Sequence, residues 1–443
     1  MISDKDLPEL ANYRRLEENL PIETVSSFGS LVVSGDNEHS PIHRWFRYKE
    51  SYSSHLLESI FSYAQINTRR RLVLLDPYCG VGTSLLSAQV SPHAIDSAIG
   101  IERNPFVAFV AKAKLGWPAI DTQELERIGI AVLSTSGDPL VSLPELSSIR
   151  TGRCITRHIA GRLLSIRDSI LEFPKSPTRE ALLVGLAAAI EPLSRVRKDG
   201  RALRLVDRSH QHVIPLLRQK WIEIQQDVLT MQSTHQRLAK TEVIHGDGRE
   251  LHAPAIEEES VDVVLTSPPY PNNIDYSEVY KLELWLLGFV NNSAEFLRLR
   301  KSTLRSHPTS DLDSEPEADF MAAIAKDPLV SFFDPLVQRT AAYKETWRNR
   351  LALRYFSDLW MSLKGQYRCL RPGGRVFFVI GNSLHGCAGK AYLIPTDLLL
   401  AQLGKALGFQ LERILITRNT RRRLSGNHFL RESIVALRKP ENG

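Results

Sequence analysis

Short apolar runs and segments of helical periodicity alternate along much of the chain. Leu72–Asp76 is an apolar run followed by a proline, and residues 98–101 form a second, so both predict buried strands. Thr83–Gln89 and residues 104–115 follow these runs with apolar positions at helical spacing. Because strands that alternate with helices form mainly parallel sheets, the pattern predicts an α/β fold.

The alternation stops between residues 121 and 240, where the pattern is mostly helical. It resumes with five predicted strands, at 242–245, 261–265, 375–380, 413–417 and 432–437. The first 40 residues show little periodicity. We therefore predict four parts: an N-terminal arm (1–40), a first part of the α/β domain (41–120), a helical insert (121–240) and a second part of the α/β domain (241–443).

Composition and charge narrow the classes of protein. Of the 443 residues, 43% are apolar, no apolar run reaches the roughly 18 residues of a membrane span, and the N-terminus lacks the apolar core of an export signal. We therefore predict a globular protein with no membrane partner.

The net charge is +6, and residues 150–240 hold 17 Lys and Arg against 8 Asp and Glu, a net of +9 that leaves −3 elsewhere. A basic insert predicts either contact with a phosphate backbone or a solvated helical surface.

Cysteine and histidine spacing favours neither a metal site nor disulfides. The cysteines Cys79, Cys154, Cys369 and Cys387 lie far apart, and the 13 histidines share no ligand spacing. We predict no metal, no disulfide framework and a place in a reducing cytoplasm. Cys79 is interpreted as a structural residue.

A glycine-rich segment follows the first predicted strand and opens a helix. It reads Asp-Pro-Tyr-Cys-Gly-Val-Gly-Thr over residues 76–83, and Gly80 and Gly82 let the backbone turn tightly and approach a ligand closely. Glu102 ends the next strand, 20 residues after Gly82, where an acid can bind both ribose hydroxyls of a nucleoside cofactor. The third glycine of a dinucleotide site is missing, as is the lysine of an ATP-binding loop, which argues against NAD and disfavours a phosphate cradle.

A second motif, Thr-Ser-Pro-Pro-Tyr over residues 266–270, directly follows the predicted strand at 261–265. Consecutive prolines end the strand and fix an extended backbone. A rigid turn with a packing tyrosine is the alternative to a functional site. The preceding strand and the glycine motif upstream favour the site.

Together the two motifs resemble those of the amino-methylating DNA methyltransferases, which transfer a methyl group from S-adenosylmethionine to an exocyclic amine. Residues 76–83 resemble the cofactor motif, with Tyr78 in place of Phe, and residues 266–270 match the catalytic motif. The resemblance extends to residues 41–53, 245–249, 371–382 and 431–439. It implies the class I methyltransferase fold, an α/β fold with a seven-stranded, mostly parallel sheet and here a helical insertion.

The resemblance also implies a target and a cofactor. Serine directly before the two prolines, as at Ser267, is typical of cytosine-N4 enzymes, whereas Asp or Asn there is typical of adenine-N6 enzymes. We therefore predict methylation of cytosine N4 in duplex DNA by S-adenosylmethionine, with adenine N6 or an RNA amine as alternatives. A catalytically inactive nucleic-acid-binding module is a further alternative. A cytosine-C5 enzyme needs a nucleophilic cysteine after a proline, and no cysteine here follows one. The resemblance also implies a cognate restriction endonuclease as a partner in a restriction–modification system.

The resemblance assigns roles to individual residues. The cofactor-binding residues are Tyr52, Ser53, Asp76, Pro77, Tyr78, Gly80, Gly82, Thr83, Glu102 and Asp247, and the catalytic residues are Ser267, Pro268, Pro269 and Tyr270. The Ser267 hydroxyl and the Pro268 carbonyl would accept hydrogen bonds from the target amine, which positions it for attack. Tyr270 would stack on a base that has left the duplex.

Basic residues in two segments are candidates for contact with the DNA backbone. They are Arg195, Arg197, Lys198, Arg201 and Arg204 in the insert, and Arg421 and Arg422 between two late strands. A solvated loop is the alternative. Recognition of the target sequence is assigned to the insert or, alternatively, to residues 291–350. Residues 298–325 are polar and are predicted to form a mobile loop that becomes ordered on DNA.

Overall fold

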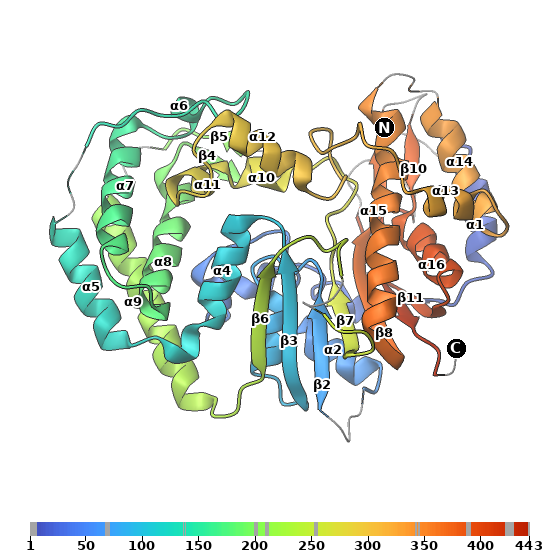
Figure 1. Cartoon of the computed structure of the whole chain (residues 1–443), viewed down its shortest axis with the longest axis horizontal. Helices are drawn as coiled ribbons and strands as arrows, with labels where there is room; N and C mark the ends of the chain where they lie inside the picture. Colours follow the sequence, from blue (N-terminus) through green and yellow to red (C-terminus); the bar gives the residue numbers. More distant parts are fainter. Residues whose placement is uncertain are drawn as a thin grey trace.

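A computed structural model of the chain describes residues 7–66, 71–135, 137, 139–198, 203–208, 212–251, 256–341, 343, 346–386, 391–420 and 429–441. Its centre is an eight-stranded sheet with the order β1-β11-β12-β8-β7-β2-β3-β6 (Figure 1). Seven of its strands are β2 (Leu72–Asp76), β3 (Ile95–Glu102), β6 (Lys240–His245), β7 (Val261–Thr266), β8 (Leu370–Gly381), β11 (Gln410–Asn419) and β12 (Arg431–Arg438). Only β12 runs antiparallel to its neighbours, β11 and β8, so the predicted α/β fold with a mostly parallel sheet is confirmed.

The eighth strand comes from the N-terminal segment. Residues 10–17 form α1 (Leu10–Glu17), and β1 (Ile22–Thr24) pairs in parallel with β11, with Ile22 opposite Ile414. The described part of residues 1–40 therefore belongs to the sheet domain, and the predicted separate arm is wrong there. A strand of three residues is too short to show an alternating pattern in the sequence.

Helices cover both faces of the sheet, and the alternation of side chains along each strand divides the core in two. Leu74 of β2 belongs to the cluster under α2 (Leu56–Tyr63), α3 (Thr83–Gln89) and α4 (Pro105–Leu115). The next residue, Leu75, belongs to the cluster under α14 (Leu329–Ala341), α15 (Trp347–Cys369) and α16 (Thr396–Ala406). The domain is thus a three-layer sandwich with the sheet in the middle.

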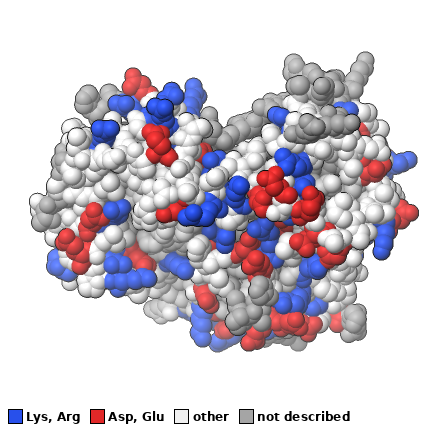
Figure 2. Space-filling model, turned by 45° about the horizontal axis from the view of Figure 1, so that its top comes forward, with Lys and Arg blue, Asp and Glu red and all other residues white. Residues whose placement is uncertain are grey.

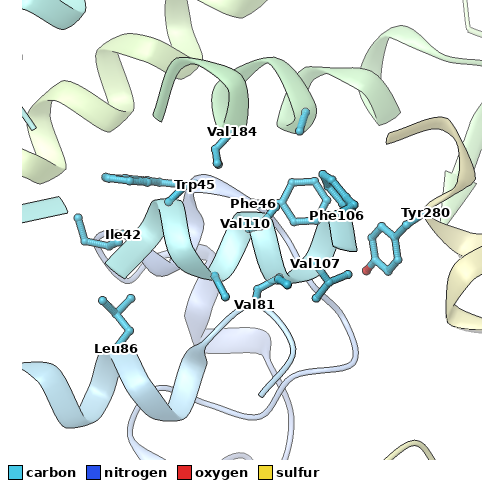
Figure 3. Close-up of a cluster of buried hydrophobic side chains, with 14 of the residues drawn as sticks. Ile42, Trp45, Phe46, Val81, Leu86, Phe106, Val107, Val110, Val184 and Tyr280 are labelled. Carbon is cyan, nitrogen blue, oxygen red and sulfur yellow. The ribbon is translucent and has the colours of Figure 1, made fainter. Parts of the chain in front are cut away.

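The insert is mostly helical, as its periodicity predicted, and Figure 1 places it beside α4. It contains α5 (Thr122–Thr135), α6 (Thr151–Cys154), α7 (Arg157–Leu171), α8 (Pro177–Leu193), the antiparallel hairpin β4 (Val196–Lys198) and β5 (Leu203–Leu205), and α9 (Val213–Thr234). The hairpin was not predicted. Figure 3 shows Val184 of α8 and Leu86 of α3 on opposite sides of α4, so the core of the insert continues into that of the sheet domain.

A buried carboxylate also fixes the insert to the N-terminal segment. Asp227 of α9 accepts hydrogen bonds from the Ile42 backbone N–H (2.9 Å), from Arg44 Nε (3.0 Å) and from Trp45 Nε1 (3.1 Å). Trp45 lies in the short helix η4 (His43–Trp45). The insert is therefore held by polar as well as apolar contacts.

The region after β7 folds into short helices above the sheet. They are α10 (Tyr276–Val279), α11 (Lys281–Leu286), α12 (Ser293–Ser302) and α13 (Ala318–Ile324), and the hairpin β9 (Ser383–His385) and β10 (Tyr392–Ile394) lies further along the chain. Short 3-10 helices occur at η2 (Ser26–Phe28), η3 (Gly35–Glu38) and η5 (Trp117–Ala119). In the described part of the chain, no helix is long and apolar enough to cross a membrane.

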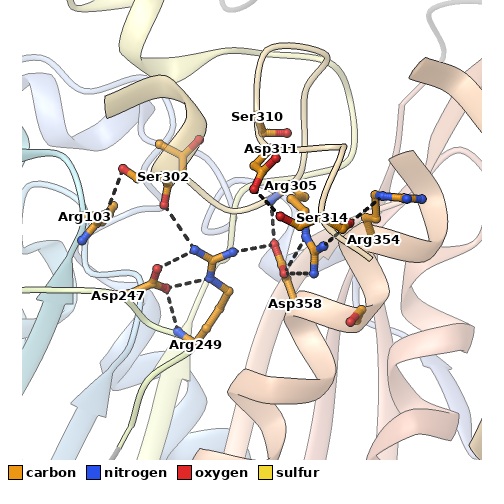
Figure 4. Close-up of polar contacts among 12 residues, drawn as sticks. Arg103, Asp247, Arg249, Ser302, Arg305, Ser310, Asp311, Ser314, Arg354 and Asp358 are labelled. Atoms are coloured by element: carbon orange, nitrogen blue, oxygen red, sulfur yellow. Dashed lines mark hydrogen bonds and ion pairs between the residues drawn. The ribbon is translucent and has the colours of Figure 1, made fainter. Parts of the chain in front are cut away.

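Residues 298–325 are anchored to α15 by buried ion pairs, which Figure 4 shows. Arg305 is 5% exposed, and its Nε and Nη2 donate to Asp358 of α15 at 2.9 and 2.6 Å. Its Nη1 donates to the Ser314 carbonyl (3.1 Å), and Arg354 of α15 donates to the same carbonyl (2.9 Å). The predicted mobile loop is therefore wrong at Arg305, whose charge is paired inside the fold, because charged side chains are buried when they are paired. The acidic side chains of Asp313 and Glu315, in contrast, are 82% and 84% exposed.

Candidate active site

The two sequence motifs meet at a single cavity of about 300 Å³ at the carboxyl ends of the parallel strands. β2 lies between β3 on one side and β7 on the other, and ligands of open α/β sheets bind at such a switch in strand order. The predicted residues that line the cavity are Tyr52, Asp76, Pro77, Tyr78, Gly80, Thr83, Glu102, Asp247, Ser267, Pro268, Pro269 and Tyr270.

Two predicted cofactor residues lie behind the cavity wall. Ser53 is buried, and its backbone N–H donates to the Leu31 carbonyl at 2.9 Å. Gly82 is the N-cap of α3 with φ +81°, and a Cβ there would lie 3.3 Å from the Cβ of Ala111 in α4. Gly82 packs the glycine-rich segment against α4, whereas Ser53 contacts the N-terminal segment, and neither residue lines the cavity.

Asp76 joins the two motifs through its buried carboxylate. It accepts hydrogen bonds from Tyr52 Oη (3.2 Å), Thr266 Oγ1 (2.7 Å), the Tyr78 N–H (3.1 Å) and the Ser84 hydroxyl. Burial raises the pKa of Asp76, and these hydrogen bonds act in the opposite direction. Because a carboxylate has about four lone-pair positions, the protein's own donors occupy Asp76 and make it a positioning residue.

Glu102 fixes the glycine loop from the end of β3. Its Oε2 accepts from the Gly80 N–H at 3.1 Å, and its Oε1 accepts from the Asn104 N–H at 2.7 Å. Gly80 has φ +53°, in the left-handed region that favours glycine, and a Cβ there would lie 3.1 Å from the Tyr48 ring. Burial raises the pKa of Glu102 to about 7. A carboxylate that lines the cavity and holds the loop suits a ligand with hydroxyl donors.

Cys79 packs inside the same loop, in agreement with its structural interpretation. A Cβ on Gly100 of β3 would lie 2.7 Å from Cys79 Sγ, so the thiol occupies the space that the glycine leaves. Burial raises the pKa of the Cys79 thiol well above its usual range, which disfavours the thiolate needed for nucleophilic chemistry.

Asp247 reaches the cavity after β6 and is held by Arg249 (Figure 4). Arg249 Nε donates to Asp247 Oδ1 at 2.9 Å and Nη2 to Oδ2 at 2.6 Å, while Nη1 donates to Asp358 at 3.1 Å. Burial opposes ionisation of Asp247, yet the hydrogen bonds from Arg249 lower its pKa. A Cβ on Gly248 would lie 2.3 Å from the Pro77 carbonyl oxygen, so this turn packs directly on the cofactor motif.

The second motif, residues 266–270, lies at the end of β7, which flanks β2 on the side opposite β3. The Ser267 hydroxyl donates to Tyr270 Oη at 3.5 Å, and both side chains are half-buried. The Tyr270 ring packs against Gly381 at the end of β8, where a Cβ would lie 2.9 Å from the ring. Burial raises the pKa of Tyr270, which keeps its phenol neutral. A hydroxyl and an aromatic side chain thus share the wall of the cavity with the buried Pro268.

The cavity has further walls that the motifs did not reveal. They include Glu50, Ser306, His307, Arg418 and Glu432. His307 is 2% exposed, and burial lowers its pKa, so this imidazole is neutral at pH 7. Glu50 and Glu432 lie in segments to which the resemblance extends, but no role was assigned to them or to Ser306, His307 and Arg418 from the sequence.

The predicted DNA contacts separate into three groups. Arg195, Arg197 and Arg204 are exposed on or next to the β4–β5 hairpin. Arg201, Arg421 and Arg422 lie outside the described residues. Lys198 is wrong as a DNA contact: its side chain is 5% exposed, its ammonium donates to Glu283 of α11, and it lies 4.2 Å above the Tyr280 ring. The carboxylate that pairs with Lys198 belongs to Glu283, 85 residues further along the chain, so the local run of basic residues does not reveal the pair.

Figure 2 adds a view of the surface charge. On the face that it shows, Lys and Arg are interspersed with Asp and Glu. The net positive charge of the insert therefore does not form one continuous basic face in this view. The exposed arginines of the hairpin remain the described candidates for phosphate contact.

The fold and the cavity together indicate an α/β domain that binds a nucleoside ligand. Proteins of similar sequence indicate the class of enzyme that the chain resembles. No protein-family model matches the chain. The type II methyltransferase M.BsoBI of Geobacillus stearothermophilus is 24% identical over an alignment of 477 positions that covers 95% of this chain and 90% of the relative. The type II methyltransferase M.AvaI of Anabaena variabilis is 25% identical over an alignment of 486 positions that covers 99% of this chain and 95% of the relative. The resemblance to DNA methyltransferases is thus confirmed over nearly the whole chain.

Solved structures give weaker matches. The rRNA methyltransferase aviRa of Streptomyces viridochromogenes has a TM-score of 0.30 at 11% identity and covers 94% of both chains. A putative DNA modification methylase of Thermus thermophilus has a TM-score of 0.23 at 20% identity, over 44% of this chain and 52% of its own. Scores this low add nothing to the assignment of function.

Proposed function

We propose that the protein is a site-specific DNA methyltransferase that transfers a methyl group from S-adenosylmethionine to the N4 amine of cytosine in duplex DNA. The observation that carries this proposal is the hydrogen bond between Thr266 and Asp76 (2.7 Å), which brings the catalytic motif and the cofactor motif to one cavity. Two relatives named as type II methyltransferases match nearly the full chain and support the DNA substrate.

The residues around the cavity fit a nucleoside cofactor. Glu102 offers a carboxylate at the carboxyl end of β3 for the ribose hydroxyls, and the positive φ of Gly80 lets the backbone approach the ligand closely. Asp247 offers a second carboxylate, held by Arg249, for the adenine amine. When bound, S-adenosylmethionine supplies the electrophilic methyl group.

Chemistry at the amine depends on positioning. An exocyclic amine is a weak nucleophile because its lone pair is shared with the ring. The Ser267 hydroxyl and the Pro268 carbonyl accept hydrogen bonds from the amine, which draws its lone pair out of conjugation and aims it at the methyl donor. No covalent enzyme intermediate is required, in keeping with the buried, high-pKa thiol of Cys79.

The target base must leave the double helix to enter the cavity. Loss of stacking and pairing costs a few kcal/mol, and stacking on an aromatic side chain returns about 1–3 kcal/mol. The Tyr270 ring, fixed on Gly381, supplies this platform. We favour cytosine over adenine as the target because a serine, Ser267, directly precedes the two prolines. The proposed biological context is protection of DNA from a cognate restriction endonuclease.

The experiment is transfer of labelled methyl groups to unmodified genomic DNA by the purified full-length protein, followed by digestion to nucleosides. Label in N4-methylcytosine supports the proposal, and label in N6-methyladenine overturns the choice of base. Label taken up by structured RNA and not by duplex DNA overturns the DNA substrate. Ser267→Ala and Tyr270→Ala should lose activity while keeping cofactor affinity, and absence of cofactor binding and of transfer by the wild type rejects the enzyme altogether.

A further inference from the structure

Three strands place a row of residues beside the catalytic motif. Gly381 at the end of β8 lies opposite Glu432 of β12, and Glu432 lies opposite Arg418 of β11. Residues directly opposite each other in a sheet point to the same face. The row therefore runs from the glycine that seats the Tyr270 ring, through a carboxylate, to a guanidinium, and both charged side chains line the cavity with Ser267.

A break in the pairing of β11 with β12 sets the direction of Arg418. Ile416 pairs with Ser433 and Arg418 with Glu432, so Thr417 is an extra residue in β11. The Thr417 hydroxyl donates to the Glu432 carbonyl at 2.8 Å, which fixes the bulge. Bulges of this kind redirect a side chain and occur next to active sites. Without the extra residue, position 418 would face the other side of the sheet.

The guanidinium is oriented and still has donors to offer. Arg418 Nε and Nη2 donate to the two carboxylate oxygens of Glu432 at 2.6 and 3.0 Å, so the pair is bidentate. A guanidinium has five N–H groups, and this pair uses two of them. The Arg418 side chain is 39% exposed and Glu432 14% exposed, so the arginine is the more open member of the pair.

We propose that Arg418, held in place by Glu432, recognises the ring edge of the target base next to its amine and thereby selects cytosine. This inference rests on the proposed function. Beside its N4 amine, cytosine presents two acceptors, N3 and O2, which match the paired donors of a guanidinium. Adenine presents the acceptor N1 beside its N6 amine and then a C–H group, so one donor would lose its partner. Sites built around a hydrogen bond discriminate strongly against a substrate that lacks it.

The test compares bases at one position of one duplex. Sequencing of DNA methylated by the wild type first identifies the modified position, which settles the proposed function independently of Arg418. Duplexes are then made with either cytosine or adenine at that position, opposite the same guanine; the mismatch favours flipping, so the rate on adenine becomes measurable. Single-turnover rates and duplex affinities are measured for the wild type, Arg418→Met, Arg418→Lys and Glu432→Gln.

Arg413→Met is the matched control. It lies on the same strand, and its Nη1 donates to Glu23 at 2.5 Å at the opposite end of β11, away from the cavity lining. Arg418→Met should lower the rate on cytosine by about 10- to 100-fold and leave the rate on adenine nearly unchanged, because a bidentate base contact is lost. Arg418→Lys should recover part of the loss, Glu432→Gln should show a smaller loss, and Arg413→Met should match the wild type.

The ratio of the two rates decides the outcome. If Arg418→Met and Arg418→Lys both keep the wild-type preference for cytosine over adenine, the inference is wrong, even where both rates fall. An equal loss of duplex affinity for both bases would instead identify a phosphate contact and also overturns base recognition. Cofactor affinity reports folding, and if Arg418→Met fails to fold, the lysine and glutamine variants decide alone. If the wild type forms N6-methyladenine, the proposed target base is wrong. That result is obtained before any variant is measured, so it is distinguishable from a failure of the inference about Arg418.

Discussion

The Thr266 hydroxyl donates a 2.7 Å hydrogen bond to the Asp76 carboxylate, and this bond joins the last residue of β7 to the last residue of β2. The two residues are 190 positions apart in the chain. Ser267 follows Thr266 directly, so we expect the position of its hydroxyl, which we propose to be catalytic, relative to residues 76–83 to depend on this contact.

Replacement of Thr266 tests that dependence. Thr266→Val keeps the shape of the side chain but removes the donor to a buried carboxylate, and we expect a loss of about 1–3 kcal/mol in the free energy of unfolding. The methyl-transfer rate should fall more than the cofactor affinity, because the displaced residue adjoins Ser267. Urea denaturation and single-turnover kinetics measure both effects. Thr266→Ser retains the donor and should behave as the wild type. If Thr266→Val also has the stability and methyl-transfer rate of the wild type, this hydrogen bond does not position Ser267.

Cofactor binding should depend on pH through Glu102. Burial raises its pKa to about 7, and its ionised carboxylate, which accepts from the Gly80 N–H, is the form that we propose to bind both ribose hydroxyls. Protonation as pH falls through 7 removes the binding-competent form. Affinity for S-adenosylmethionine should therefore decrease about tenfold from pH 8 to pH 6, as a group with this pKa changes from about nine-tenths to one-tenth ionised.

Calorimetric titration at several pH values measures this dependence. Glu102→Gln is the matched control, because the ligand's own titration is the same for both proteins. The variant should bind weakly at every pH and show a nearly flat profile. A wild-type profile that is equally flat would show that Glu102 does not titrate in this range.

The sequence was sufficient for features whose determinants are close together in the chain. Leu72–Asp76 is a strand because a short apolar run meets a proline and glycines, and the structure contains it with the predicted bounds. Residues 266–270 were recognised as a motif for the same reason, since two prolines and a tyrosine adjoin a buried strand.

Features that depend on distant partners were missed. Glu432 and Arg418 become neighbours only when β12 pairs with β11 around the extra Thr417, and no local pattern specifies that register. The basic neighbours of Lys198 predict contact with the DNA backbone, yet its partner Glu283 lies 85 residues further along the chain. Short apolar or polar segments therefore specify secondary-structure elements. The ion pairs and the residues that complete the cavity lining depend on tertiary packing.

Gly381 should be essential for the position of Tyr270. A Cβ at this position would lie 2.9 Å from the tyrosine ring, so Gly381→Ala must push the ring toward the place of the target base. We expect the methyl-transfer rate to fall by about 10-fold or more, in line with the sensitivity of reactive geometry to small displacements, with unchanged cofactor affinity. Gly35→Ala is the control, because a Cβ there meets nothing within 4 Å. A Gly381→Ala enzyme with the wild-type rate would show that the ring position is not critical.

The Lys198–Glu283 pair should matter for stability and not for contact with DNA. Both side chains are at least 95% buried, and burial raises the pKa of Glu283, so loss of the lysine leaves a carboxylate without its partner inside the fold. Lys198→Met should lower the free energy of unfolding by about 3–5 kcal/mol, as measured by urea denaturation. Arg197→Met, at an exposed neighbouring position, should change stability by less than about 0.5 kcal/mol.

A double variant separates the lost ion pair from lost packing. Glu283→Gln combined with Lys198→Met removes the charge that the single variant leaves behind, so it should recover much of the stability, because an absent buried pair is less harmful than a broken one. If the double variant is as unstable as the single one, the lysine stem and its contact with the Tyr280 ring account for the effect instead. DNA affinity measured at two salt concentrations completes the comparison: Arg197→Met should weaken binding and reduce its salt dependence, whereas the double variant should change neither.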